Sequence, residues 1–280
     1  MLDWLLEPFS GAIMQRALAE ILVLSLACGP VGVWILLHRQ SYAAESIAHA
    51  MLPGLVVAAL VGAPLIAGGA GGLLVAAALI ALAGREQRLG ADVGVAVAIT
   101  ALFGLGALLA LSPEVPPRLP ELLFGDPLGV TWGDVAGAAI LTVAVLGVIG
   151  LGHRGLVLSA FDATAAPSLG VRPGRWSFGL LVLLAICTLA AVEGLGNLLV
   201  VALILAPGAA ALQLAERLPA ALALSALLAA ASGILGLLAS FHWQVAAGAA
   251  IALTAVLVFL VVLLLPRRSR ATAGSGVVPA

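Results

Sequence analysis

Residues 245–265 read VAAGAAIALTAVLVFLVVLLL and contain no ionisable side chain. About twenty predominantly apolar residues in an α-helix cross the hydrocarbon core of a bilayer once, so this stretch predicts a membrane-spanning helix. The rest of the chain is similar, because 63% of the 280 residues are hydrophobic and only 9% are charged. This composition excludes a water-soluble enzyme, a disordered tail and a disulfide-stapled secreted module.

Nine apolar segments are candidates for crossings. They cover residues 12–37, 47–61, 65–83, 93–111, 135–151, 176–191, 195–214, 220–240 and 245–265. We therefore predict an all-α, polytopic membrane protein with eight to nine transmembrane helices, forming a single domain over residues 1–280. Eight crossings plus an interfacial helix is the alternative, because the first segment contains Arg16, Glu20 and the pair Gly29-Pro30. We also expect Pro30, Pro53 and Pro207 to break or kink their helices.

The arginines predict the orientation of the chain, because short cytoplasmic loops retain positive charge. All twelve basic residues are arginine, and a cytoplasmic C-terminus places every one except Arg16 and Arg118 on the cytoplasmic side. Residues 152–175 then form a cytoplasmic loop and residues 266–280 a cytoplasmic tail. A chain without lysine also lacks the lysine of a nucleotide-binding P-loop. We therefore expect a non-enzymatic chain whose energy from ATP would come from a separate ATPase.

The loop 152–175 reads GHRGLVLSAFDATAAPSLGVRPGR and is too polar to cross a bilayer. Residues 159–169 are compatible with short helical turns, and Asp162 is a candidate cap. This pattern favours a small helix on the cytoplasmic face of the membrane, where a partner protein would dock.

Glu45 and His49 are the strongest candidate site residues. They are four positions apart, which places both side chains on one face of a helix. Ten residues separate Arg39 from His49, about 15 Å of helical rise, so His49 is expected near the middle of the bilayer. A carboxylate and an imidazole are suitable ligands for zinc, manganese or iron. A packing role, with His49 hydrogen-bonded to Glu45, and a proton relay are the alternatives.

Other polar residues give weaker signals. Glu193, Asn197 and His242 could line an outer cation path, although the favoured interpretation of each is a solvated residue near the outer interface. Cys28 and Cys187 lie in apolar runs and are expected to be small buried hydrophobes. His38 and His153 fall in predicted cytoplasmic loops, and we assign them no chemistry.

Four stretches together resemble the permease subunits of bacterial metal-ion ABC importers, which carry zinc, manganese or iron. They are GPVGVWILLHRQSYAAESIAHAMLPG at 29–54, LFGDPLGVTWGD at 123–134, FDATAAPSLGV at 161–171 and GNLLVVALILAPGAAA at 196–211. The resemblance covers essentially the whole chain. The family usually has aspartate at the acid position, whereas this chain has the longer Glu45.

The resemblance implies a type II ABC-importer-like permease in the bacterial cytoplasmic (inner) membrane. It also implies a homodimer, two separate ATPase subunits and an extracytoplasmic metal-binding protein, with no nucleic acid and no permanently bound cofactor. Glu45 and His49 correspond to the family's metal path, and the 161–171 stretch to its coupling helix. Within that stretch the ATPase-coupling residues would be Phe161, Asp162, Ala165, Leu169 and Gly170.

The expected cargo is a divalent transition-metal ion, with zinc the first choice, manganese the second and iron next. An iron-chelate permease and a stand-alone proton-coupled metal transporter are the alternative functions.

Overall fold

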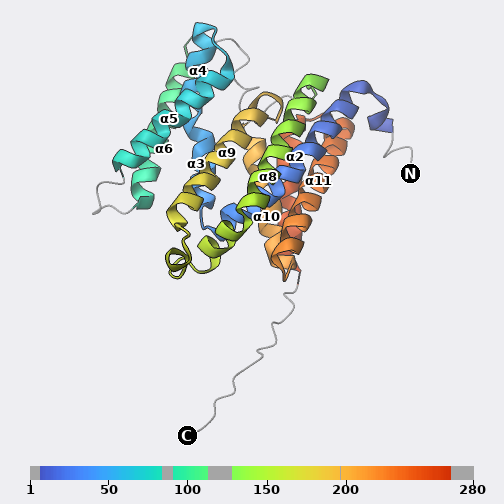
Figure 1. Ribbon diagram of the computed structural model, residues 1–280. Helices are drawn as coiled ribbons and strands as arrows, with labels where there is room; N and C mark the ends of the chain where they lie inside the picture. Colours follow the sequence, from blue (N-terminus) through green and yellow to red (C-terminus); the bar gives the residue numbers. More distant parts are fainter. Residues whose placement is uncertain (1–6, 84–90, 113–127, 196, 266–280) are drawn as a thin grey trace.

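The computed structural model describes residues 7–83, 91–112, 128–195 and 197–265, and all regular structure in these ranges is helical (Figure 1). Two short 3-10 helices, η1 and η2, accompany ten α-helices. In chain order these are η1 (Glu7–Ser10), α2 (Ala12–Leu37), α3 (Ser41–Ala50), α4 (Leu52–Val61), α5 (Leu65–Ala83), α6 (Ala91–Ala110), α8 (Trp132–Phe161), η2 (Ala166–Leu169), α9 (Pro173–Leu195), α10 (Asn197–Leu214), α11 (Leu218–Trp243) and α12 (Ala247–Leu264).

The all-α prediction is confirmed within the described ranges, and each of the nine apolar segments coincides with helical structure. The second segment is divided at Met51 into α3 and α4. Four helices, α2, α8, α11 and α12, are individually long and apolar enough to span a membrane. The chain is therefore a multi-pass helical membrane protein.

The helices form two groups (Figure 1). The larger group is built around α2, which packs against α8, α10 and α11, while α12 packs against α10 and α11. The smaller group consists of α4, α5 and α6, which pack against one another. Helix α3 connects the groups, because it contacts α6 on one side and α9 and α10 on the other.

Helix α2 is a central element of the larger group. Of its most apolar 18-residue window, 72% is buried inside the protein, which does not fit the alternative of an interfacial first helix. The crossing of α2 and α10 depends on glycine at both helices. A Cβ atom at Gly208 would lie 2.9 Å from the carbonyl carbon of Gly32, and a Cβ atom at Gly32 would collide with the backbone of Ile204. Small residues allow the two backbones to approach this closely.

The expected helix breaks occur at one of the three prolines. Pro53 falls in the first turn of α4, directly after the break at Met51. Pro30 and Pro207 instead lie inside α2 and α10, which continue through them, so the helices do not break there and a kink at these two positions stays a prediction. Both prolines are buried, and packing of α2 and α10 against each other holds the helices together across the missing backbone donors.

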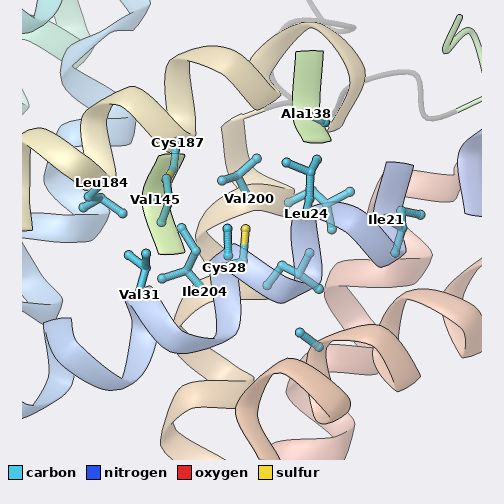
Figure 2. Packing of buried hydrophobic residues seen from close by; sticks show 14 of the residues in the cluster. Ile21, Leu24, Cys28, Val31, Ala138, Val145, Leu184, Cys187, Val200 and Ile204 are labelled. Carbon is cyan, nitrogen blue, oxygen red and sulfur yellow. The ribbon is translucent and has the colours of Figure 1, made fainter. Parts of the chain in front are cut away.

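The core of the larger group is shown in Figure 2. The residues labelled there come from α2, α8, α9 and α10, and they include Leu24, Val145, Leu184 and Ile204. Helices α3, α11 and α12 also contribute to the cluster. Cys28 and Cys187 are buried in the same cluster as free thiols. This confirms the prediction that both cysteines act as small apolar core residues.

The two ends of the bundle differ in charge. One end, here called the η2 end, includes η2, the C-termini of α2 and α8 and the N-termini of α3 and α9 (Figure 1). Six arginines lie in the described ranges, and only Arg16 lies toward the opposite end. The other five, Arg39, Arg154, Arg172, Arg175 and Arg217, lie toward the η2 end.

Candidate functional site

Glu45 and His49 both lie on α3, one helical turn apart. Together α3 and α4 run from Ser41 to Val61, a length of about 30 Å, which is close to the thickness of the hydrocarbon core. His49 is eight residues from the start of α3, or about 12 Å from the η2 end. The α3–α4 pair therefore carries this imidazole to the interior of the apolar layer.

The two side chains differ in their surroundings. Glu45 is exposed on the surface of the single chain, and His49 is half-buried. The imidazole of His49 packs edge to face against the ring of Phe103 on α6, with the ring centroids 5.2 Å apart. The pair is thus accessible at the chain's surface, and His49 has one aromatic neighbour that restricts its orientation.

Two donors from one helix make an incomplete metal site. The described residues contain no group of three or more His, Cys, Asp or Glu side chains that could hold a metal ion. Metal sites for zinc, manganese or iron use four to six ligands. The remaining ligands at Glu45 and His49 would have to come from water, from another chain or from residues outside the described ranges.

A cavity of about 480 Å³ opens between α4, α5 and α6, close to this pair. It begins at Pro53 and Gly54, and its walls include Val57, Val75 and Leu105. None of its described lining residues carries an ionisable side chain. These apolar side chains offer nothing to replace the hydration shell of a cation, so they contribute no ligands to an ion path.

The residues 162–172, here called the η2 segment, connect α8 to α9. Asp162 caps the C-terminus of α8, and its Oδ1 accepts a 2.9 Å hydrogen bond from the Ala165 backbone N–H. Gly170 ends η2 in the left-handed region, at φ 76°, where glycine is favoured. Phe161 and Leu169 are exposed hydrophobic residues at the two ends of the turn, and Ala165 is half-buried.

The observed connection between α8 and α9, residues 162–172, is shorter than the predicted loop 152–175. Helix α8 continues to Phe161 and has 30 residues, about 45 Å in length, so its C-terminal turns extend beyond a hydrocarbon core of about 30 Å. Its N-terminus is fixed by a capping box, in which Thr131 and Asp134 bond reciprocally. The predicted tail at 266–280 lies outside the described residues.

The three residues of the predicted outer cation path are placed only in part. Glu193 lies in α9 and Asn197 begins α10, but their side chains fall outside the described part of the chain. His242 lies in the last turn of α11, half-buried, with its ring 5.2 Å from the ring of Phe241. The outer path remains a prediction.

Sequence reasoning missed a group of contacts at the η2 end. His38, directly after α2, has Nε2 3.0 Å from Oγ of Ser159 on α8 and Nδ1 2.9 Å from the Trp34 carbonyl oxygen. Burial lowers the pKa of His38, and the bond to the Trp34 carbonyl opposes this shift in part. The ring of Trp34 also contacts His153 edge to face, at 5.8 Å. These histidines lie 115 positions apart in the sequence, so no local pattern could reveal their shared neighbour.

A second contact at the η2 end does have a local signal. Trp176 on α9 fills a notch in α8 formed by Gly152 and Gly155. A Cβ atom at Gly152 would lie 2.6 Å from Cζ3 of this indole, so the notch requires glycine. Two glycines three residues apart, near the end of an apolar helix, are typical of close helix packing.

Residues 10–266 match the family model described as the ABC 3 transport family. The chain belongs to the ABC 3 transport family. The match extends from the start of α2 to the end of α12, so it includes both the α3 pair and the η2 segment. It confirms the resemblance to metal-ion ABC permeases that the four sequence stretches carried.

Members of this family with similar sequences carry names that refer to metals. The chain is 33% identical over 254 residues to the manganese transport system membrane protein MntC of Halalkalibacterium halodurans, with 90% of this chain and 87% of that protein covered. It is 29% identical to a probable iron transport system membrane protein of Haemophilus influenzae, with 94% and 97% covered.

The fold also matches solved structures. PsaBC from Streptococcus pneumoniae, determined in complex with Fab, gives a TM-score of 0.86 at 27% identity, covering 97% of this chain and 98% of that one. A putative metal-chelate type ABC transporter in an inward-facing conformation gives a TM-score of 0.68 at 16% identity, with 89% and 84% covered, a likeness of fold alone.

Proposed function

We propose that this chain is the membrane-spanning permease subunit of an ATP-driven importer that carries a divalent transition-metal ion. The observation that carries the proposal is the Glu45–His49 pair on α3, accessible at the surface of a chain that belongs to the ABC 3 transport family. An ionisable pair at this depth is costly unless it meets water or a ligand. A passing cation is such a ligand.

Two copies of the chain would complete the site. A two-fold axis beside α3 would bring a second Glu45 and His49 to the first pair and provide four donors, which suits a divalent ion. Glu45 is exposed in the single chain, as this arrangement requires. Binding in such a site must remain weak enough for the ion to leave.

The chain needs partners for the rest of the cycle. It contains no lysine, so it has no P-loop of its own, and a pair of ATPase subunits would supply the energy by docking at the arginine-rich η2 end. By the charge rule that end would be cytoplasmic, and the membrane would be the bacterial inner membrane. An extracytoplasmic metal-binding protein would deliver the ion to the opposite end. ATP binding and hydrolysis would then open the cavity between the two copies of the chain to one side of the membrane at a time.

The names of the relatives favour manganese or iron as cargo, whereas the sequence alone placed zinc first. Direct uptake distinguishes the three, because zinc can occupy an N/O site tightly without being carried. Proteoliposomes that contain this chain, its ATPase and the metal-binding protein would be supplied with radioactive Mn²⁺, Fe²⁺ or Zn²⁺. We expect ATP-dependent uptake of Mn²⁺ or Fe²⁺ to exceed that of Zn²⁺.

The decisive test replaces the pair itself. We expect Glu45→Gln combined with His49→Ala to lower Mn²⁺ uptake at least about ten-fold, because an ion would lose two donors per chain. Glu7→Gln, at an exposed carboxylate of η1, is the matched control. Normal uptake by the double variant, in an assembled complex, would remove the site assignment. Uptake that needs a proton gradient and no ATPase would instead favour a stand-alone transporter.

A further inference from the structure

The residues 38–40 between α2 and α3, here called the 38–40 elbow, are bonded to both helices that flank the η2 segment. On one side, Nε2 of His38 lies 3.0 Å from Oγ of Ser159, two residues before the end of α8. On the other side, Nε2 of Gln40 donates a 3.3 Å hydrogen bond to the Ser177 carbonyl, within the first turns of α9. The elbow therefore contacts the chain just before and just after the η2 segment.

The bond between His38 and Ser159 has a defined chemistry. Nδ1 of His38 lies against the Trp34 carbonyl, which can only accept, so Nδ1 carries the proton of the neutral ring. Nε2 then accepts from the Ser159 hydroxyl. That hydroxyl also lies 2.7 Å from the Gly155 carbonyl oxygen, within its own helix. The hydroxyl therefore has two acceptors in reach, one on α8 itself and one on the elbow.

The end of α8 and the start of α9, which flank the η2 segment, are packed tightly together. Trp176 of α9 fills the notch at Gly152 and Gly155 of α8, next to the segment. Ser159 and Ser177 lie on these two helices. A displacement of the η2 segment that moves the joined ends of α8 and α9 would therefore shift both serines in the same direction.

The elbow leads directly into the helix that carries the candidate metal pair. Arg39 adopts φ 57°, a left-handed conformation that is uncommon for a residue other than glycine, and the chain turns sharply there. Helix α3 begins at Ser41, and Glu45 follows one turn later. A short helix of packed residues moves as a rigid element, so a shift at the elbow reaches Glu45 and His49.

We propose that His38 and Gln40 are positioning residues through which the η2 segment moves α3, so that docking of the ATPase changes access to the Glu45–His49 pair. This inference rests on the proposed function and adds the physical connection between its two sites. The connection consists of one hydrogen bond to each helix beside the η2 segment.

Two substitutions of one residue separate this role from simple packing. In glutamine the side-chain amide reaches roughly the place of Nε2, where its oxygen can accept from the Ser159 hydroxyl, so His38→Gln keeps an acceptor for Ser159. In asparagine it occupies roughly the place of Nδ1, so His38→Asn keeps only the bond to Trp34. Ser159→Ala removes the hydroxyl from the other side. Ser177→Ala is a control, since only the backbone carbonyl of Ser177 takes part. Ser232→Ala is a second control, because its buried hydroxyl bonds within its own helix.

The measurement is the ratio of Mn²⁺ ions transported to ATP hydrolysed, in proteoliposomes containing the complete complex. We expect His38→Asn and Ser159→Ala each to lower this ratio on the order of five-fold, the value of one ordinary hydrogen bond. The double variant should be no worse than either single one. His38→Gln, Ser177→Ala and Ser232→Ala should stay within about two-fold of the unmodified complex. An unchanged ratio in His38→Asn and Ser159→Ala would overturn the proposal.

A second measurement does not depend on transport. Spin labels would be attached to cysteines introduced at the exposed residues Tyr42 of α3 and Leu235 of α11, while the two native cysteines are buried. Addition of ATP should change the distance between the labels in the otherwise unmodified complex, and the change should be clearly smaller in Ser159→Ala, in which only the bond from Gln40 remains. A change of equal size in both, or in neither, would contradict the link. Failure of the unmodified complex to take up any metal, with the distance change intact, would instead refute the proposed cargo alone.

Discussion

The imidazole ring of His49 on α3 meets the phenyl ring of Phe103 on α6 edge to face, with centroids 5.2 Å apart and ring planes at 76°. This geometry is favoured between aromatic rings because the positive edge of one faces the negative face of the other. The contact ties the candidate metal ligand to the smaller helix group, whereas Glu45 on the same helix is exposed. Phe103 therefore orients the imidazole of His49, although Phe103 itself has no atom that could bind a metal ion.

We expect Phe103→Leu to weaken the apparent affinity for the transported ion about two- to ten-fold, because an aromatic pair contributes about 0.5–1.5 kcal/mol beyond its buried area. The measurement is KM for Mn²⁺ uptake. Phe178→Leu, at an exposed phenyl ring of α9, is the control and should leave KM unchanged. Equal KM values for the two variants would show that Phe103 does not orient His49.

The crossing of α2 and α10 gives a stability prediction. Gly32→Ala should destabilise the protein by about 1–3 kcal/mol, because the added methyl group meets the backbone at Ile204 and the helices must separate. The check is the thermal unfolding midpoint in detergent. Gly147→Ala is the control, since a Cβ atom there meets nothing within 4 Å and alanine favours the helix. A Gly32→Ala midpoint at or above that of Gly147→Ala would rule out the tight crossing.

Much of the fold follows from local sequence, and the exceptions have physical causes. The apolar run at 65–83 coincides with α5, because length and hydropathy determine a membrane helix. The helices do not break at Pro30 and Pro207, because α2 and α10 pack against each other, which local sequence does not show. The Glu45–His49 pair was visible through its helical spacing. The bond from His38 to Ser159 was not, because 121 positions separate the two residues.

His38 also predicts a dependence of stability on pH. Burial lowers its pKa in the folded protein, whereas in the unfolded chain it titrates near its ordinary value of about 6.5. As the pH falls through about 6.5, His38 becomes protonated in the unfolded chain but not in the folded one. The stability of the fold is therefore highest above this pH and declines below it. We expect the unfolding midpoint to fall between pH 7.5 and pH 5.5 by a larger amount in the unmodified protein than in His38→Gln. Parallel pH curves for the two proteins would contradict a lowered pKa.

The turn at the η2 segment gives the last prediction. The Ala165 backbone N–H donates to Oδ1 of Asp162, and the Ala165 carbonyl accepts from the hydroxyl of Ser168 at 2.7 Å. Ala165→Pro removes the first donor, and Asp162→Lys removes its acceptor and reverses a charge. We expect either change to leave ATP hydrolysis within about two-fold and to lower metal transport about ten-fold, because the segment would lose the shape that meets the ATPase. Ser168→Ala keeps the Asp162–Ala165 bond and should cost less. Transport and hydrolysis that fall in proportion in both variants would place the docking surface elsewhere on the η2 end.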